Sequence, residues 1–368
     1  MELPPFLLDH WLAAYEFADP PISYNLASST GPRWSVDDVL GIDGGRHDIG
    51  RVTISYAPAE GSAELREAIA AFHGVDPEWV VVTTGASEAL SILFCLAARP
   101  AANIVLPSPA FPAFEAMANA WGIGARHYEL QRENGYRQSA DGVIASLHPD
   151  TVLALVSTPH NPAGSVMTGA ETERLAGELA ARGIPLIVDE VYHPLYFEAP
   201  VPTAASVPGV VVVSDMSKAL SLPGLRIGWV IAADPEYRKR IIDARSYFTI
   251  SGSPVIEAIA AHALRNRVAI LKRLSAVATD NLAALERFMN EVGDVLGWSK
   301  PAGGTVSFPW FRDGRDSRAF CQKLAAHGVL VAPGDCFGKP DHMRVGFGQQ
   351  AEGYGQALTI FRQALRET

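Results

Sequence analysis

The chain has 368 residues, of which 48% are hydrophobic and 19% charged, so it can bury a large core and form about two domains. Its net charge is −10 without any lysine or arginine run, which argues against nucleic acid or an anionic membrane as partner. No apolar stretch approaches the roughly 20 residues of a membrane span. Cys95, Cys321 and Cys336 lack disulfide or metal spacing, and residues 1–5 do not resemble a secretory signal, so we expect a cytoplasmic protein.

In chain order, residues 1–35 are rich in proline, serine and glycine and predict no definite element. From about 80 to 230, short apolar runs alternate with amphipathic segments, which is typical of a mostly parallel sheet covered by helices. The predicted strands are 80–83, 104–106, 152–156, 186–188 and 210–213, and the predicted helices are 65–73, 87–98, 112–121 and 170–182.

The last third of the chain has a different pattern. Residues 254–292 predict one long helix, and 303–308 and 342–347 are strand-like, with helical segments between and after them. This order indicates a small α+β domain attached through a long helix.

Ligands of parallel α/β sheets bind beyond the carboxyl ends of the strands, so the residues after each predicted strand are the first candidates for a site. After the first strand, Gly85, Ala86 and Ser87 open a helix, whose free N–H groups suit a phosphate; an ordinary turn with an N-cap is the alternative. After the second strand, Phe111 is a candidate to stack on a flat heterocycle, with a core aromatic as the alternative.

The next two predicted strands end in polar residues. The Asn161 amide lies between two prolines and can donate to a phenolate oxygen or complete a turn, while His160 favours a structural role. Asp189 requires a cationic partner, for which a pyridinium nitrogen is suitable, and Tyr192 can donate to the same group. Asp189 and Glu190 as metal ligands are the competing hypothesis, which the opposite directions of adjacent strand residues disfavour.

Lys218 lies in a Ser/Gly-rich turn after the fifth strand, where it is poorly placed for packing and well placed for covalent chemistry. A desolvated amine with a lowered pKa forms Schiff bases with carbonyl cofactors such as pyridoxal 5′-phosphate (PLP). Arg226 follows in the same segment and supplies a positive charge suited to a phosphate.

These motifs, in this order, resemble the class I/II aminotransferases of the aspartate aminotransferase superfamily, which are PLP-dependent enzymes of fold type I. The resemblance covers nearly the whole chain. It implies a large PLP-binding domain over 36–255 and a small α+β domain made of 1–35 and 256–368. The matching positions are Tyr56, Gly61, Leu65, Arg66, Pro109, Phe111, Asn161, Pro162, Gly164, Asp189, Tyr192, Ser217, Lys218, Arg226, Gly228 and Arg344.

The resemblance also implies the roles of the site residues. Lys218 would hold PLP as an internal aldimine and later move the proton, and Asp189 would keep the pyridine nitrogen protonated. Asn161 and Tyr192 would contact the phenolic oxygen, and Phe111 would stack on the ring. The implied phosphate ligands are Ala86, Ser87, Ser217 and Arg226.

In the family, a tyrosine at the position of Tyr56 reaches the phosphate of the neighbouring subunit, which implies a homodimer with shared sites. Arg344, together with Asn161, would bind the substrate carboxylate. One position departs from the family pattern: Asp215 stands where many relatives have serine or threonine. A carboxylate facing a phosphate is repelled, so either Asp215 turns away to pair with a cation or to cap the backbone, or the phosphate cup is rebuilt.

The resemblance predicts transamination between an L-amino acid and a 2-oxo acid. The alternative is another PLP-dependent reaction, by a decarboxylase, lyase, cyclase or oxidase, since one fold supports several chemistries. A PLP-binding regulator lacks support because no helix-turn-helix pattern precedes the matching region. A nicotinamide dehydrogenase is excluded by the missing glycine fingerprint. No second arginine is assigned to a distal carboxylate. Arg33 and Trp34 are expected to be ordinary loop residues, with entry into the site from the N-terminal segment as the alternative.

Overall fold

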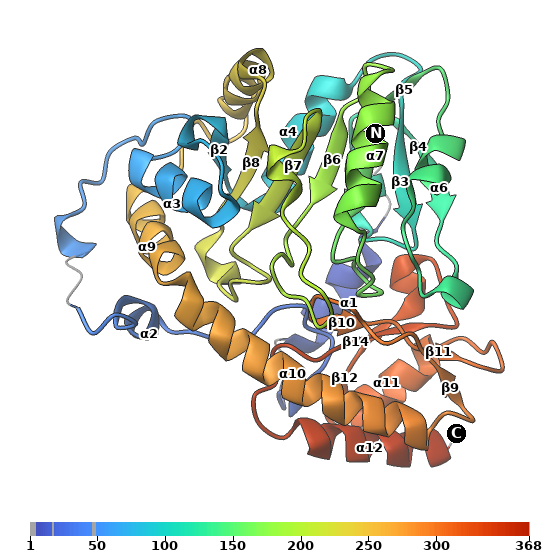
Figure 1. Cartoon of the computed structure of the whole chain (residues 1–368). Helices are drawn as coiled ribbons and strands as arrows, with labels where there is room; N and C mark the ends of the chain where they lie inside the picture. The colour runs from blue at the N-terminus through green and yellow to red at the C-terminus, as the bar shows by residue number, and fades with distance from the viewer. Residues whose placement is uncertain (1–4, 17, 46–48, 368) are drawn as a thin grey trace.

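The computed structural model describes residues 5–16, 18–45 and 49–367 (Figure 1). The expectation about a secretory signal falls mostly on residues 1–4, outside these ranges. None of the helices in the described ranges has the length and apolarity needed to cross a membrane. All three cysteines are free thiols.

A seven-stranded sheet forms the centre of the molecule, as the predicted mostly parallel sheet requires. The strand order is β2-β8-β7-β6-β5-β3-β4, and β8 alone runs opposite to the other six strands. The strands are β2 (Val80–Thr83), β3 (Asn103–Ser108), β4 (Gly124–Glu129), β5 (Thr151–Ser157), β6 (Leu186–Asp189), β7 (Val210–Asp215) and β8 (Gly228–Ala232).

Helices cover both faces of this sheet because successive strand residues point to opposite sides. On β2, Val81 packs in the cluster that contains α4 residues such as Phe94, whereas Val82 packs in the cluster that contains Leu65 of α3. The helices of this part are α3 (Ala63–His73), α4 (Gly85–Ala97), α5 (Ala113–Ala120), α6 (Ala140–Ala145), α7 (Gly169–Ala180) and α8 (Pro235–Arg245).

The single long helix predicted over 254–292 is wrong in one respect: the segment forms α9 (Pro254–Arg265) and α10 (Arg267–Glu291). Between them, the Asn266 side chain donates to the His262 carbonyl at 3.1 Å, a local hydrogen bond that competes with the helical pattern. Helix α10 then runs along the lower edge of the molecule toward the C-terminal part (Figure 1).

The C-terminal part is a small α+β unit. The two strand-like segments pair with each other as β10 and β14, antiparallel, with Val306 opposite Gly346. Its elements are β9 (Leu296–Gly297), β10 (Val306–Ser307), β11 (Trp310–Phe311), α11 (Arg318–Ala326), β12 (Val329–Leu330), β13 (Ala332–Pro333), β14 (Met343–Gly346) and α12 (Tyr354–Arg366).

The N-terminal segment, for which no element was predicted, packs against this C-terminal part. It contains α1 (Leu7–Glu16), β1 (Tyr24–Asn25) and α2 (Val36–Leu40). Strand β1 pairs in parallel with β12, and the Trp11 indole donates to the Val331 carbonyl at 2.9 Å. Figure 1 shows α1 between the large sheet and β10–β14.

A buried amide fixes α10 to the chain that leads into α12. The Asn281 Nδ2 donates to the carbonyls of Phe347 at 3.0 Å and Gln350 at 2.7 Å. We expect Asn281→Leu to lower the free energy of unfolding by about 2 kcal/mol, because two carbonyls lose their donor. Urea unfolding measures the change, with exposed Asp280→Asn as the matched control. Equal midpoints for the two variants would contradict the assigned role of this amide.

Candidate active site

The structure brings Lys218, Asp189, Asn161 and Arg344 together beyond the carboxyl ends of β5, β6 and β7. Lys218 is half-buried, and its amine donates to the Ser29 hydroxyl at 2.9 Å. Burial lowers the pKa of Lys218, and the charges of Arg344 and Arg226 act in the same direction against those of Asp215 and Asp189. A lowered amine pKa is what nucleophilic and proton-transfer roles require.

Asp189 is the last residue of β6, and its carboxylate is buried. The Val191 N–H donates to Oδ1 at 3.1 Å, and the Ser157 hydroxyl donates to Oδ2 at 3.4 Å. Burial raises the pKa of Asp189 to about 7, and the charge of Asp215 adds to this effect. The negative charge of this carboxylate is therefore not fully balanced by its surroundings, and the group is suited to a cationic partner.

Glu190 points away from Asp189, as alternation along a strand requires. Its carboxylate accepts from the Thr203 hydroxyl and from the Ala204 N–H, both at 2.6 Å. The two neighbouring carboxylates thus face different surroundings. No group of three or more potential metal ligands exists in the part of the chain that the structure describes.

Arg344, on β14, is 2% exposed and makes no ion pair with any described residue. Its guanidinium donates to Asn161 Oδ1 at 3.3 Å and to the Ala27 carbonyl at 2.7 Å, and it lies over the Phe337 ring at 5.1 Å. Its Nε has no hydrogen-bond partner. A buried guanidinium with these neutral neighbours is suited to an incoming carboxylate.

Tyr192 and His160 are both completely buried near this group. The Tyr192 hydroxyl has no hydrogen-bond partner in the described ranges, and burial raises the pKa of Tyr192 to about 12. Burial lowers the pKa of His160 to about 4, so the imidazole stays neutral at pH 7, in keeping with the structural role expected for it.

The turn that opens α4 lies directly against Arg226. Gly85 has a φ of +77° and lies against the Arg226 guanidinium, and a Cβ on Gly228 would lie 2.4 Å from the Gly85 carbonyl carbon, so both positions favour glycine. Ala86 and Ser87 follow in the first turn of α4, where free N–H groups and a guanidinium meet.

Asp215, the residue that departs from the family pattern, caps the turn that carries Lys218. Its Oδ1 accepts from the Ser217 N–H at 2.8 Å, so the carboxylate is engaged by the backbone. Of the alternatives raised by the sequence, capping of the backbone is the one observed.

Phe111 and Tyr56, the two aromatic residues that the resemblance assigns to the cofactor, lie in different surroundings. Phe111 packs edge-on between Phe114, at 5.6 Å between ring centroids, and Phe6, at 6.0 Å. Tyr56 is 83% exposed, so within one chain it is not brought to the site.

Sequence reasoning missed the contribution of the N-terminal segment. Ser29 accepts from Lys218, Ala27 accepts from Arg344, and Phe6 touches Phe111. The serines and threonine at 28–30 are the only local signal, and such runs are common in loops. Trp34, expected to be an ordinary loop residue, lies under the Arg273 guanidinium at 4.4 Å and lines a cavity together with Arg33.

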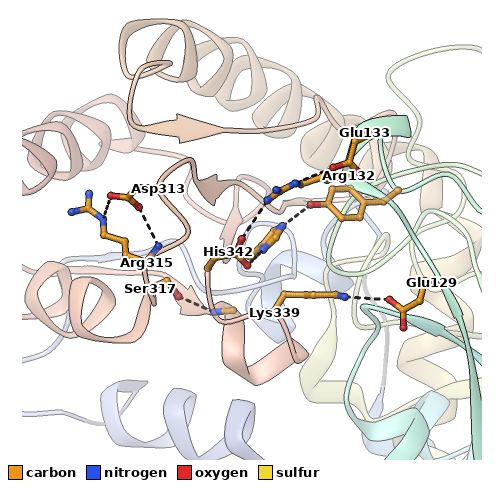
Figure 2. Close-up of polar contacts among 11 residues, drawn as sticks. Glu129, Arg132, Glu133, Asp313, Arg315, Ser317, Lys339 and His342 are labelled. Carbon is orange, nitrogen blue, oxygen red and sulfur yellow. Dashed lines mark hydrogen bonds and ion pairs between the residues drawn. The ribbon is translucent and has the colours of Figure 1, made fainter.

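Polar contacts anchor the strand that carries Arg344 to the large sheet (Figure 2). Just before β14, the His342 Nε2 lies 2.6 Å from the Tyr136 hydroxyl, and Asp341 lies 3.3 Å from Arg132. Lys339 pairs with Glu129, at the end of β4, at 3.2 Å. These links connect the 129–136 segment with the chain that leads into Arg344.

The sequence matches the family described as aminotransferase class I and II over residues 42–360. It is 30% identical over 352 residues to capreomycidine synthase from Streptomyces vinaceus, covering 94% of this chain and 90% of that protein. A PLP-dependent aminotransferase from Streptococcus suis superposes with a TM-score of 0.91 at 26% identity, covering 100% of this chain and 99% of that one. The PLP-dependent cyclase OrfR superposes with a TM-score of 0.90 at 26% identity, covering 100% and 98%.

These matches extend over both parts of the fold. They include proteins described as aminotransferases and proteins described as a synthase or cyclase, so they define the cofactor and the family more closely than the reaction. The predicted family, fold type and cofactor are confirmed. The chain belongs to the class I and II aminotransferases, enzymes whose cofactor is pyridoxal 5′-phosphate.

Proposed function

We propose that the enzyme transfers an amino group between an L-amino acid and a 2-oxo acid. The observation that carries the proposal is that a half-buried Lys218, whose pKa is lowered, lies within electrostatic range of the buried Arg344 guanidinium, which makes no ion pair with any described residue. Arg344 and Asn161 would bind the substrate α-carboxylate, and Lys218 would remove the Cα proton and return it at the cofactor.

The site fits PLP on three observations. The Tyr192 hydroxyl is buried without a partner, and Asp189 lacks a full counter-charge. The Arg226 guanidinium lies against Gly85, at the start of α4, where free N–H groups can join it on a phosphate. When bound, PLP supplies an electron sink for the charge that develops at Cα.

The proposed cofactor contacts follow from these positions. Asp189 would keep the ring nitrogen protonated, while Tyr192 and Asn161 would contact the phenolic oxygen. Phe111 would pack on the ring face. The proposed phosphate ligands are Ala86, Ser87, Ser217 and Arg226.

We also propose a homodimer in which Tyr56 reaches the partner's phosphate. Support comes from the exposed apolar side chains on the 49–60 and 246–253 segments; Arg245, just before the second segment, donates to the Ala59 carbonyl near the end of the first. A monomer leaves few such groups clustered in water. They are Ile54, Tyr56, Tyr247, Phe248 and Ile250.

We also propose that the chain is divided into two domains. We assign 36–255 to the large domain and 1–35 with 256–368 to the small one. The parallel pairing of β1 with β12 supports the inclusion of the N-terminal segment in the small domain.

Cyclisation is the second candidate, and it is favoured by the similarity to capreomycidine synthase and to the cyclase OrfR. The same proton abstraction by Lys218 serves both reactions, which differ in whether nitrogen leaves the substrate. Two measurements separate them, one on the cofactor and one on the product.

The reaction type can be tested in a single half-reaction to which no oxo acid is added. Adding one L-amino acid to the PLP-loaded enzyme is expected to convert the visible cofactor band to the near-ultraviolet band of pyridoxamine phosphate and to release one 2-oxo acid per site. Spectrophotometry and product mass analysis measure both. A visible band that persists while a cyclic product or ammonia forms would move the enzyme to the second candidate.

The role of Asp189 can be tested by comparing it with Glu190, the adjacent buried carboxylate. Asp189→Asn is expected to lower kcat about 100- to 1000-fold, because the ring nitrogen loses its counter-charge. Glu190→Gln is expected to leave kcat within about threefold, since Glu190 faces Thr203 and Ala204 instead. Steady-state kinetics tests the pair, and equal losses in both variants would contradict the assignment.

A further inference from the structure

Tyr136 lies between the two segments that supply Arg344 and its side-chain partner. It is 2% exposed, and both its hydroxyl and its backbone carbonyl are hydrogen-bonded. The hydroxyl lies 2.6 Å from His342 Nε2, just before β14, and the carbonyl accepts from the Ser165 hydroxyl at 2.8 Å. One buried residue is therefore tied both to the strand that carries Arg344 and to the loop that carries Asn161.

The direction of the first hydrogen bond follows from the groups around His342. Its Nδ1 lies 2.7 Å from Asp341, and an ionised carboxylate can only accept, so Nδ1 carries the proton. Burial lowers the pKa of His342, and the neutral ring leaves Nε2 as the acceptor for the Tyr136 hydroxyl. Arg132 pairs with the same carboxylate at 3.3 Å, and Figure 2 shows Arg132 and His342 meeting at this junction.

His342 is connected to Arg344 in two ways. The two residues are two positions apart on one extended segment, so their side chains project to the same side. The Phe308 ring stacks on His342 at 4.6 Å between centroids and meets Phe337 edge-on at 5.6 Å. The Phe337 ring in turn lies 5.1 Å from the Arg344 guanidinium. The position of the His342 ring therefore bears on Arg344 through the strand and through a stack of aromatic rings.

The second hydrogen bond of Tyr136 leads to the other side of the same pair. The Ser165 carbonyl accepts from the His160 N–H at 2.8 Å, which closes the loop that contains Asn161. Asn161 Oδ1 then accepts from the Arg344 guanidinium at 3.3 Å. Tyr136 thus supports both residues to which the proposed function assigns the substrate α-carboxylate.

The backbone of Tyr136 has a conformation that large side chains seldom adopt. Its φ is +58°, in the left-handed region that favours glycine. Such a conformation persists only where the surroundings determine it, and these cases gather at functional sites. Here the ring packs edge-on against Phe308 at 6.2 Å, and the hydroxyl and the carbonyl reach His342 and Ser165 at the same time.

We propose that Tyr136 is a positioning residue, which sets the spacing and the plane of the Arg344–Asn161 pair and thereby the affinity for the substrate α-carboxylate. The inference rests on the proposed function for the role of Arg344. A guanidinium binds a carboxylate through two parallel hydrogen bonds only while it keeps its plane, and buried hydrogen-bonded networks fix such planes. The competing interpretation is that the contacts of Tyr136 only hold the two parts of the chain together.

The test compares ligands that differ only in the carboxylate. The PLP-loaded enzyme is titrated with L-norleucine and pentylamine, with L-arginine and agmatine, and with L-tyrosine and tyramine, and dissociation constants are taken from the first change of the cofactor spectrum. The ratio of amine to amino acid dissociation constants measures what the carboxylate contributes. We expect this ratio to fall about tenfold in Tyr136→Phe and about threefold in Ser165→Ala, with the affinity for PLP itself unchanged within about twofold.

Tyr196→Phe is the matched control, because the Tyr196 hydroxyl is also bonded to a histidine, His193, at 2.9 Å. It should leave the ratio unchanged, and an equal fall in this variant would overturn the inference. So would a full ratio in Tyr136→Phe and Ser165→Ala, even with a lowered melting temperature, since the contacts would then be purely structural.

Arg344→Gln separates failure of this inference from failure of the proposed function. It is expected to bring the ratio close to one. If it does so while Tyr136→Phe keeps the full ratio, the inference alone is wrong. If Arg344→Gln keeps the ratio, or the unmodified enzyme shows no preference for the carboxylate, the role assigned to Arg344 is wrong and the inference falls with it.

Discussion

The structure depends on the burial of unlike charges at one edge of the sheet without direct pairing between them. Lys218 lies within electrostatic range of both Asp189 and Arg344, yet each of the three is held by hydroxyl, amide or carbonyl groups. Charges removed from water are costly unless partners compensate them. Here the missing partners match the parts of PLP and of an amino acid: a pyridinium for Asp189 and a carboxylate for Arg344.

The rest of the fold serves this arrangement. The parallel strands β5, β6 and β7 bring Asn161, Asp189 and Lys218 to the same edge. Strand β14 carries Arg344 from the C-terminal part, and the links around His342 and Lys339 anchor its approach. The N-terminal segment closes the site from the remaining side, so residues more than 300 positions apart along the chain, such as Ala27 and Arg344, meet within hydrogen-bonding distance.

The central strands and the polar residues at their ends were predictable from the sequence, because strands buried on both faces leave continuous apolar runs and turn residues mark where these runs end. The edge strand β4 escaped prediction because, of its six residues, only Tyr128 is buried, so no apolar run exists. The break at Asn266 was missed because the helical pattern continues across it, and the side-chain hydrogen bond to the His262 carbonyl does not appear in that pattern. Ser29 and Ala27 act through a hydroxyl and a backbone carbonyl that local sequence does not distinguish from any other loop.

The central claim, that Lys218 is the residue to which the cofactor is attached, has a direct chemical test. The PLP-loaded enzyme is reduced with borohydride, digested and mapped by mass spectrometry. The account predicts a stable pyridoxyl group on the peptide that contains Lys218, and its loss in Lys218→Ala. A pyridoxyl group on another lysine, or none at all in a protein that retains the visible band, would contradict it.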